Sequence, residues 1–124
     1  MIFEMSRWLA NARLSLASPN GMTRPSWPRI RKEASWACQH LLLGIEKQDA
    51  RTLSPREAAA VQDVSTLNGF DPDRTILVDD VKVVVAFMDD PEKGDRDRAR
   101  EALVRLHDLV SYYANLILLR PLTE

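Results

Sequence analysis

The stretch DRDRAREALVRLHDLVSYYANLILL, residues 95–119, has the strongest helical period in the chain. Its apolar residues recur every three or four positions, the spacing that places side chains on one face of an α-helix. Asp95 is a suitable N-cap, and Glu101 precedes Arg105 by the four residues that suit a surface ion pair. We therefore predict a long core helix. Its buried face comprises Ala102, Leu103, Leu106, Leu109, Val110, Tyr113, Leu116 and Ile117.

The last turn of this predicted helix is apolar on every side, because four aliphatic residues follow one another from Leu116 to Leu119. An apolar helix end of this kind needs a cover, either from the protein's own core or from another chain. The core is the simpler interpretation. The alternative is that Tyr112, Leu118 and Leu119 contact a partner.

Weaker periods of the same kind predict four earlier helices, at residues 2–17, 28–48, 54–67 and 75–88. Gly44 interrupts the second of them at a cost of about 1 kcal/mol relative to alanine, which suggests that another helix packs closely against it.

The third predicted helix has clear boundaries. Ser54, Pro55 and Glu57 match a capping box, in which serine caps the helix, proline occupies its first position and glutamate reaches back to the cap. Asn68 and Gly69 are predicted to end the helix, with the glycine in the left-handed conformation.

Residues 75–88 admit two interpretations. Their valines favour a β-strand, and a hairpin could turn at Asp79 and Asp80. A helix fits the spacing better, and we favour it. Its apolar stripe would comprise Leu77, Val81, Val84 and Met88.

Composition indicates one globular domain over residues 1–124, because 45% of the residues are hydrophobic and 28% are charged. With the predicted helices this gives an all-α fold, about five helices in a small up-and-down bundle. The single cysteine, Cys38, permits no internal disulfide and favours a reducing, cytoplasmic setting. No uncharged apolar run approaches the roughly 20 residues that cross a membrane.

No motif for catalysis or ligand binding stands out in the sequence. The two histidines are far apart, and neither a phosphate-binding glycine motif nor a Gly-x-Ser-x-Gly motif occurs. We therefore expect no enzymatic activity, no cofactor and no metal site. The enzymatic alternative would need a pocket in which His40 or His107 meets a carboxylate or Cys38.

The leading functional hypothesis is binding of a macromolecular partner, as a regulator, an inhibitor or an assembly subunit. Self-association into a homo-oligomer is one form of it. The predicted helix at 75–88 is apolar over most of its surface, and acidic residues are frequent near it. We expect its flank, between core and solvent, to bind the partner. The predicted partner-binding residues are Ile76, Asp80, Val83, Phe87, Asp89 and Asp90.

The alternative hypothesis is contact with nucleic acid, as in a small subunit of a nucleoprotein assembly. Residues 1–33 contain six lysines and arginines but only two glutamates, and basic residues interleaved with an aromatic suit a nucleic-acid strand. The possible contacts are Arg24, Trp27, Arg29, Arg31 and Lys32. In the competing interpretation Trp27 folds onto the core and the basic residues are only solvated.

Overall fold

The computed structural model describes residues 1–70 and 75–118. These residues form five α-helices and one 3-10 turn, so the predicted all-α bundle of about five helices is confirmed. The elements are α1 (Ile2–Ala17), η1 (Gly21–Thr23), α2 (Trp27–Glu46), α3 (Pro55–Phe70), α4 (Val78–Asp89) and α5 (Arg96–Leu118). Residues 78–89 are helical, so the hairpin alternative is wrong.

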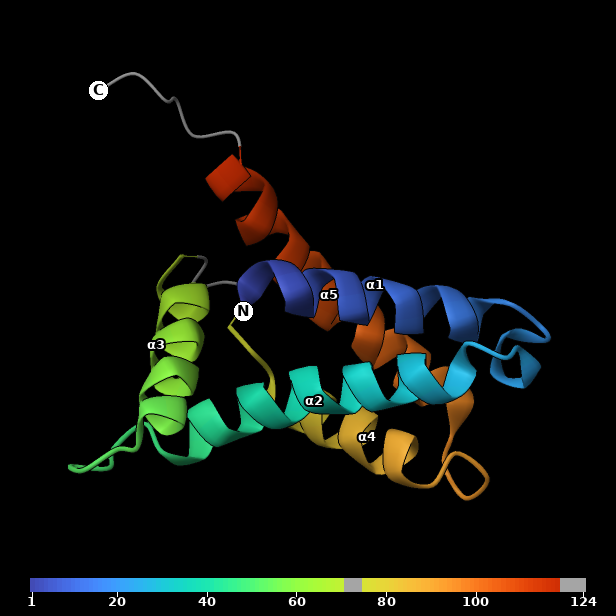
Figure 1. Ribbon diagram of the computed structural model, residues 1–124, viewed down its shortest axis with the longest axis horizontal. Helices are drawn as coiled ribbons and strands as arrows, with labels where there is room; N and C mark the ends of the chain where they lie inside the picture. Colours follow the sequence, from blue (N-terminus) through green and yellow to red (C-terminus); the bar gives the residue numbers. More distant parts are fainter. Residues whose placement is uncertain (71–74, 119–124) are drawn as a thin grey trace.

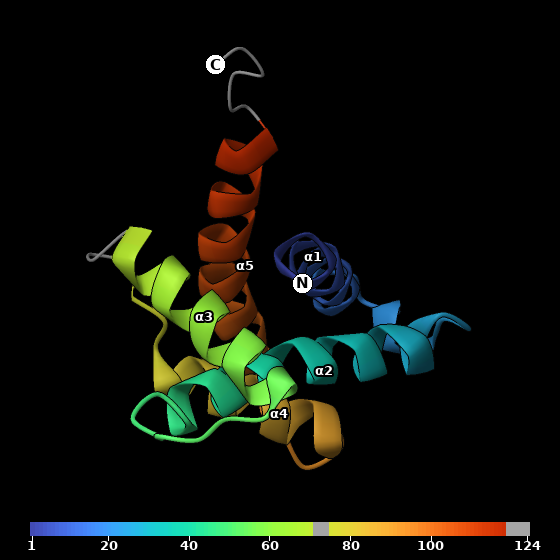
Figure 2. The same ribbon diagram turned by 60° about the vertical axis from the view of Figure 1, so that its left-hand side comes forward.

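Helix α2 is the centre of the bundle, because it packs against α1, α3 and α4 (Figure 1). Helix α5 closes the other side by packing against α1 and α4. Helix α3 stands across one end of α2. Both views show the C-terminal part of α5 extending beyond the other helices (Figures 1 and 2).

The core contains most of the apolar residues that the spacing predicts, but Tyr113 and Ile117 are only partly buried, and Leu116 and Leu77 are exposed. Leu116 is 38% exposed because it lies where α5 extends beyond its neighbours. Leu77 is 50% exposed because it precedes α4 in extended backbone, where the helical period does not apply. Ile76 turns inward in its place.

The predicted starts of α3 and α5 are confirmed, whereas α4 begins at Val78 and not at residue 75. The backbone N–H of Glu57 donates to Ser54 Oγ at 3.2 Å, and the Ser54 N–H donates to Glu57 Oε1 at 2.9 Å. The N–H of Arg98 donates to Asp95 Oδ1 at 3.1 Å. The prediction that Gly69 ends the helix in the left-handed conformation is wrong. Helix α3 continues through Gly69, and no described residue has a positive φ. Leu119, a predicted partner contact, lies outside the described residues.

Two arginines from distant parts of the chain hold helix C-termini. Arg31 of α2 donates to the carbonyl oxygens of Met88 and Asp89 at the end of α4. Arg96 donates to the carbonyl oxygens of Leu16, at 2.9 Å and 3.1 Å, and of Ser18 at the end of α1. Terminal carbonyls lack partners within their own helix, so these arginines satisfy them and complement the helix dipole.

Candidate functional site

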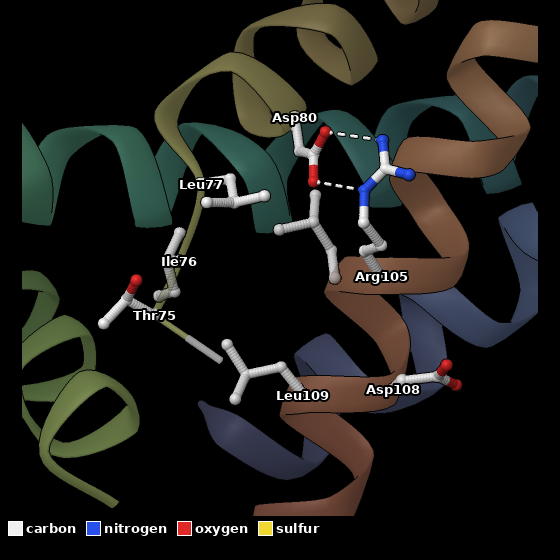
Figure 3. A pocket seen from close by; sticks show the side chains of 8 residues that line it. Thr75, Ile76, Leu77, Asp80, Arg105, Asp108 and Leu109 are labelled. Carbon is white, nitrogen blue, oxygen red and sulfur yellow. Dashed lines mark hydrogen bonds and ion pairs between the residues drawn. The ribbon is translucent and has the colours of Figure 1, made fainter. Parts of the chain in front are cut away.

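A cavity of about 240 Å³ lies between α5, the first turn of α4 and the extended segment 75–77 (Figure 3). Its wall is largely aliphatic, and polar groups stand at its edge. The lining residues are Thr75, Ile76, Leu77, Asp80, Arg105, Leu106, Asp108 and Leu109.

The segment 75–77 is held in place by a hydrogen bond to α3. The backbone N–H of Ile76 donates to Asn68 Oδ1 at 2.7 Å, and the Ile76 side chain is buried. Because this residue is fixed at both its backbone and its side chain, the extended segment forms a defined wall of the cavity.

The polar edge of the cavity is a two-point ion pair between α4 and α5. Arg105 Nε donates to Asp80 Oδ2 at 2.7 Å, and Arg105 Nη2 donates to Asp80 Oδ1 at 2.8 Å (Figure 3). The Asp80 side chain is only 10% exposed, whereas that of Arg105 is 52% exposed. Hydrogen bonding to Asp80 raises the pKa of Arg105 above its ordinary value. The first turn of α4 also favours a carboxylate. The main partner of Arg105 is therefore Asp80, and Glu101 adds only a weaker attraction.

A second group of charges stands where α1 meets α5. Arg13 Nη1 donates to Asp108 Oδ1 at 2.8 Å and lies 3.1 Å from His107 Nδ1. A guanidinium can only donate, so His107 Nδ1 accepts and its imidazole is neutral. Burial, followed by the charge of Arg13, lowers the pKa of His107, and Asp108 opposes this in part.

The lowered pKa of His107 predicts a loss of stability in acid. Protonation of His107 favours the unfolded chain, where its pKa is near 6.5. The contribution of neutral His107 to the free energy of unfolding is therefore complete above pH 6.5 and is lost as the pH falls below that value. Between about pH 7.5 and 5.5, the urea midpoint should fall more for the wild type than for His107→Asn, whose amide oxygen can still accept from Arg13. Parallel curves for the two proteins would contradict this prediction.

Exposed apolar side chains surround the cavity. Leu77 and Val78 lie on its α4 side, and Leu116 lies on α5 two turns beyond Leu109. Residues 105, 109, 112 and 116 are separated by four, three and four positions, so they share one side of α5. We call this surface the α5 face; it comprises the cavity together with Leu77, Val78, Tyr112 and Leu116.

The structure does not bring the six predicted partner-binding residues onto one open surface. Ile76 and Asp80 line the cavity of the α5 face. Val83, Phe87 and Asp90 line a separate hollow of about 490 Å³ beside the turn between α4 and α5. Ile76, Asp80 and Phe87 were expected on an open flank between core and solvent. All three are buried instead, with Phe87 only 2% exposed. Asp89 is exposed, and its carbonyl oxygen accepts from Arg31.

The possible nucleic-acid contacts are also divided. Trp27 is 8% exposed and belongs to the core, so it offers no stacking surface. Arg31 holds the end of α4, and Arg29 lies 3.7 Å from the carboxylate of Glu33. The five predicted residues therefore do not form one basic face with an aromatic centre.

Arg24 and Lys32 are exposed, and the ammonium of Lys32 lies 5.2 Å from the ring centroid of Trp36. Trp36, which is half-exposed, also meets the ring of Trp8 edge-on at 6.0 Å. The exposed tryptophan of this region is thus Trp36, which ends the basic cluster at residues 24–36 but was not among the five predicted contacts.

One histidine does meet a carboxylate, as the enzymatic alternative requires. His40 Nε2 lies 2.8 Å from Asp63 Oδ2 and links α2 to α3. His40 is buried, and neither residue lines any of the cavities described above. Burial raises the pKa of the Cys38 thiol to about 12, which keeps it protonated and unreactive at neutral pH.

Three further findings concern the described residues. No three histidine, cysteine or carboxylate side chains among them gather as a metal ion would require. None of their helices combines the length and the apolar character needed to cross a membrane. Comparisons with known protein families, with curated proteins and with solved structures find no match for this chain.

Proposed function

We propose that this chain is a non-enzymatic binding module that docks a protein partner on the α5 face. The observation that carries the proposal is the position of the cavity. Exposed Leu77 is part of its wall, exposed Val78 follows Leu77 in the chain, and exposed Leu116 lies two turns beyond the lining residue Leu109 on the same side of α5. Burying apolar surface of this kind gives about 25 cal/mol for each Å² removed from water, so a partner that covers the face is favoured.

The size of the cavity favours a protein side chain over a small-molecule ligand. Pockets for drug-sized ligands usually enclose about 300–1,000 Å³. The cavity, at about 240 Å³, is smaller than that range. Protein interfaces commonly concentrate their binding energy where one large side chain fills a desolvated pocket and weaker contacts surround it. The α5 face has this arrangement, with the cavity at its centre and polar groups at its edge.

The charges around the cavity set the kind of partner. Arg105 and Asp108 stand at its edge, and each is already bonded to a group of opposite charge. A strongly charged partner would therefore gain little, because it would have to compete with existing ion pairs. A partner with an apolar helix or loop and an uncharged centre suits the site best.

Charge substitutions on the α5 face test the proposal. Leu77→Arg and Leu116→Arg should each weaken partner capture at least tenfold, since either places a cation in a contact that must lose its water. Leu14→Arg is the matched control, because Leu14 is 66% exposed on α1. Capture from cells of the source organism, with each purified variant as bait, provides the measurement, and self-association counts as capture. If all three variants retain the partners of the wild type equally, the α5 face is not the binding surface.

A further inference from the structure

We infer that the partner on the α5 face is a second copy of this chain, which makes the protein a twofold-symmetric dimer. This inference rests on the proposed function and adds the identity of the occupant. It follows from three features of the face: its self-complementary shape, its internally paired charges and its size.

The α5 face carries both a projecting apolar side chain and an apolar cavity, on the same side of one helix. Leu116 is exposed in the last turn of α5, the helix whose C-terminal part extends beyond the bundle (Figure 2), and Leu109 lines the cavity. The two are seven residues apart, about 10 Å at ~1.5 Å per residue. A twofold axis that runs beside α5 in the interface, perpendicular to the helix and level with the midpoint of the two residues, would place Leu116 of each copy over the cavity of the other. Such a contact closes with two copies and leaves no face open for a third.

The charges near the proposed axis allow two identical copies to approach. Self-association brings like charges together, which usually opposes it. Here the basic and acidic groups of the face are bonded to each other within one copy, Arg105 to Asp80 and Arg13 to Asp108. Each of these two ion pairs is therefore nearly neutral, so neither pair adds a strong repulsion between two copies.

The size of the face indicates that the dimer is reversible. A strip of α5 from Arg105 to Leu118 is about 20 Å long and about 10 Å wide. Stable interfaces take about 800 Å² from each partner, and smaller ones are generally transient. The strip offers about 200 Å² per copy, well below that value, so we expect a weak, transient dimer rather than an obligate one.

Directed cross-linking between copies tests the geometry. Two variants that each gain one cysteine, Leu116→Cys and Leu77→Cys, are mixed under mild oxidation. The native Cys38 does not compete, because it is buried. The mixed 77–116 disulfide should form at least tenfold faster than the disulfide between Leu116→Cys and the control Leu14→Cys. In parallel, light scattering should show the wild-type mass rising from monomer toward dimer with concentration. Leu116→Arg should abolish this rise and Leu14→Arg should preserve it, with equal urea midpoints for both variants.

Three outcomes overturn the inference. The first is a wild type that stays monomeric up to millimolar concentration. The second is a dimer that Leu116→Arg leaves intact, and the third is equal formation of the 77–116 and 14–116 disulfides. If the protein is monomeric but captures a different protein in a Leu116-dependent way, only the second-copy inference fails. If neither kind of binding depends on Leu116, the proposed function fails as well.

Discussion

Replacing Gly44 with alanine is expected to lower the free energy of unfolding by about 1–2 kcal/mol, even though alanine is the better helix former. Gly44 lies in α2 where α3 crosses it. A Cβ atom at this position would lie 2.3 Å from the carbonyl oxygen of Ala60 and 2.5 Å from a methyl group of Val64. These distances are far below van der Waals contact, so α2 and α3 would have to separate.

The expected cost follows from what surrounds the new methyl group. Its nearest neighbour is backbone, which cannot rotate away as a side chain can, and Val64 is completely buried. Overpacking of this kind typically costs 1–3 kcal/mol, and the propensity gain of about 1 kcal/mol offsets only part of it. The separation would also stretch the 2.8 Å contact between His40 and Asp63, which bridges the same two helices.

Gly69→Ala is the matched control, because it makes the same change near the end of α3. A Cβ atom there meets no atom within 4 Å, so only the helix propensity changes. We expect this variant to be as stable as the wild type or up to about 1 kcal/mol more stable. Urea unfolding of the two variants separates packing from propensity. A Gly44→Ala protein as stable as Gly69→Ala would show that α2 and α3 are not in close contact.

The helices were predictable because the signals that form them are local. The predicted boundaries of α1 are those of the structure, and Asp95 caps α5 as expected. Each of these predictions depends on residues within four positions of one another. Gly44 shows how far local reasoning extends: a glycine inside a helical pattern indicated that another helix packs there, although the sequence could not name α3 as that helix.

Contacts between distant residues could not be predicted in this way. Sequence alone suggested Arg31 as a possible nucleic-acid contact and assigned no role to Arg96, yet each holds the C-terminus of a helix more than fifty residues away. Arg105 has a possible partner four residues before it, but its hydrogen bonds go to Asp80. Since a buried carboxylate gains more from a two-point ion pair than an exposed one, tertiary packing decided which partner Arg105 took.

The predicted partner-binding surface shows why a binding site is harder to predict than a helix. The period of α4 showed how wide its apolar arc is, but not which neighbour covers each part of it. Phe87 was expected at the edge of that arc, and in the structure it packs beneath the turn that contains Gly94. Leu77 was assigned to the core, and it is exposed beside the cavity because α4 begins one residue later. A shift of three residues at the helix start, from residue 75 to Val78, therefore exchanged a core position for a surface position.

Replacing Arg105 with alanine is expected to cost about 2 kcal/mol of stability, although Arg105 is half-exposed. The loss arises at Asp80, whose carboxylate is nearly buried and would lose both hydrogen bonds from Arg105. A charge left without partners in a buried position costs more than the ion pair itself contributes. The exposed end of Arg105 and the dipole of α4 reduce the cost, so we place it below the 3–5 kcal/mol typical of fully buried pairs.

The matched control is Arg29→Ala, which removes an arginine whose side chain is 73% exposed and whose partner lies 3.7 Å away. Surface pairs of this kind contribute between zero and about 1 kcal/mol, so its urea midpoint should barely change. Asp80→Asn distinguishes the cause, because it removes the buried charge while keeping the shape of the side chain. If the loss arises from an unpaired carboxylate, adding Asp80→Asn to Arg105→Ala should restore part of the stability. If the double variant is less stable than Arg105→Ala alone, the packing of the arginine side chain against the cavity matters more than its charge.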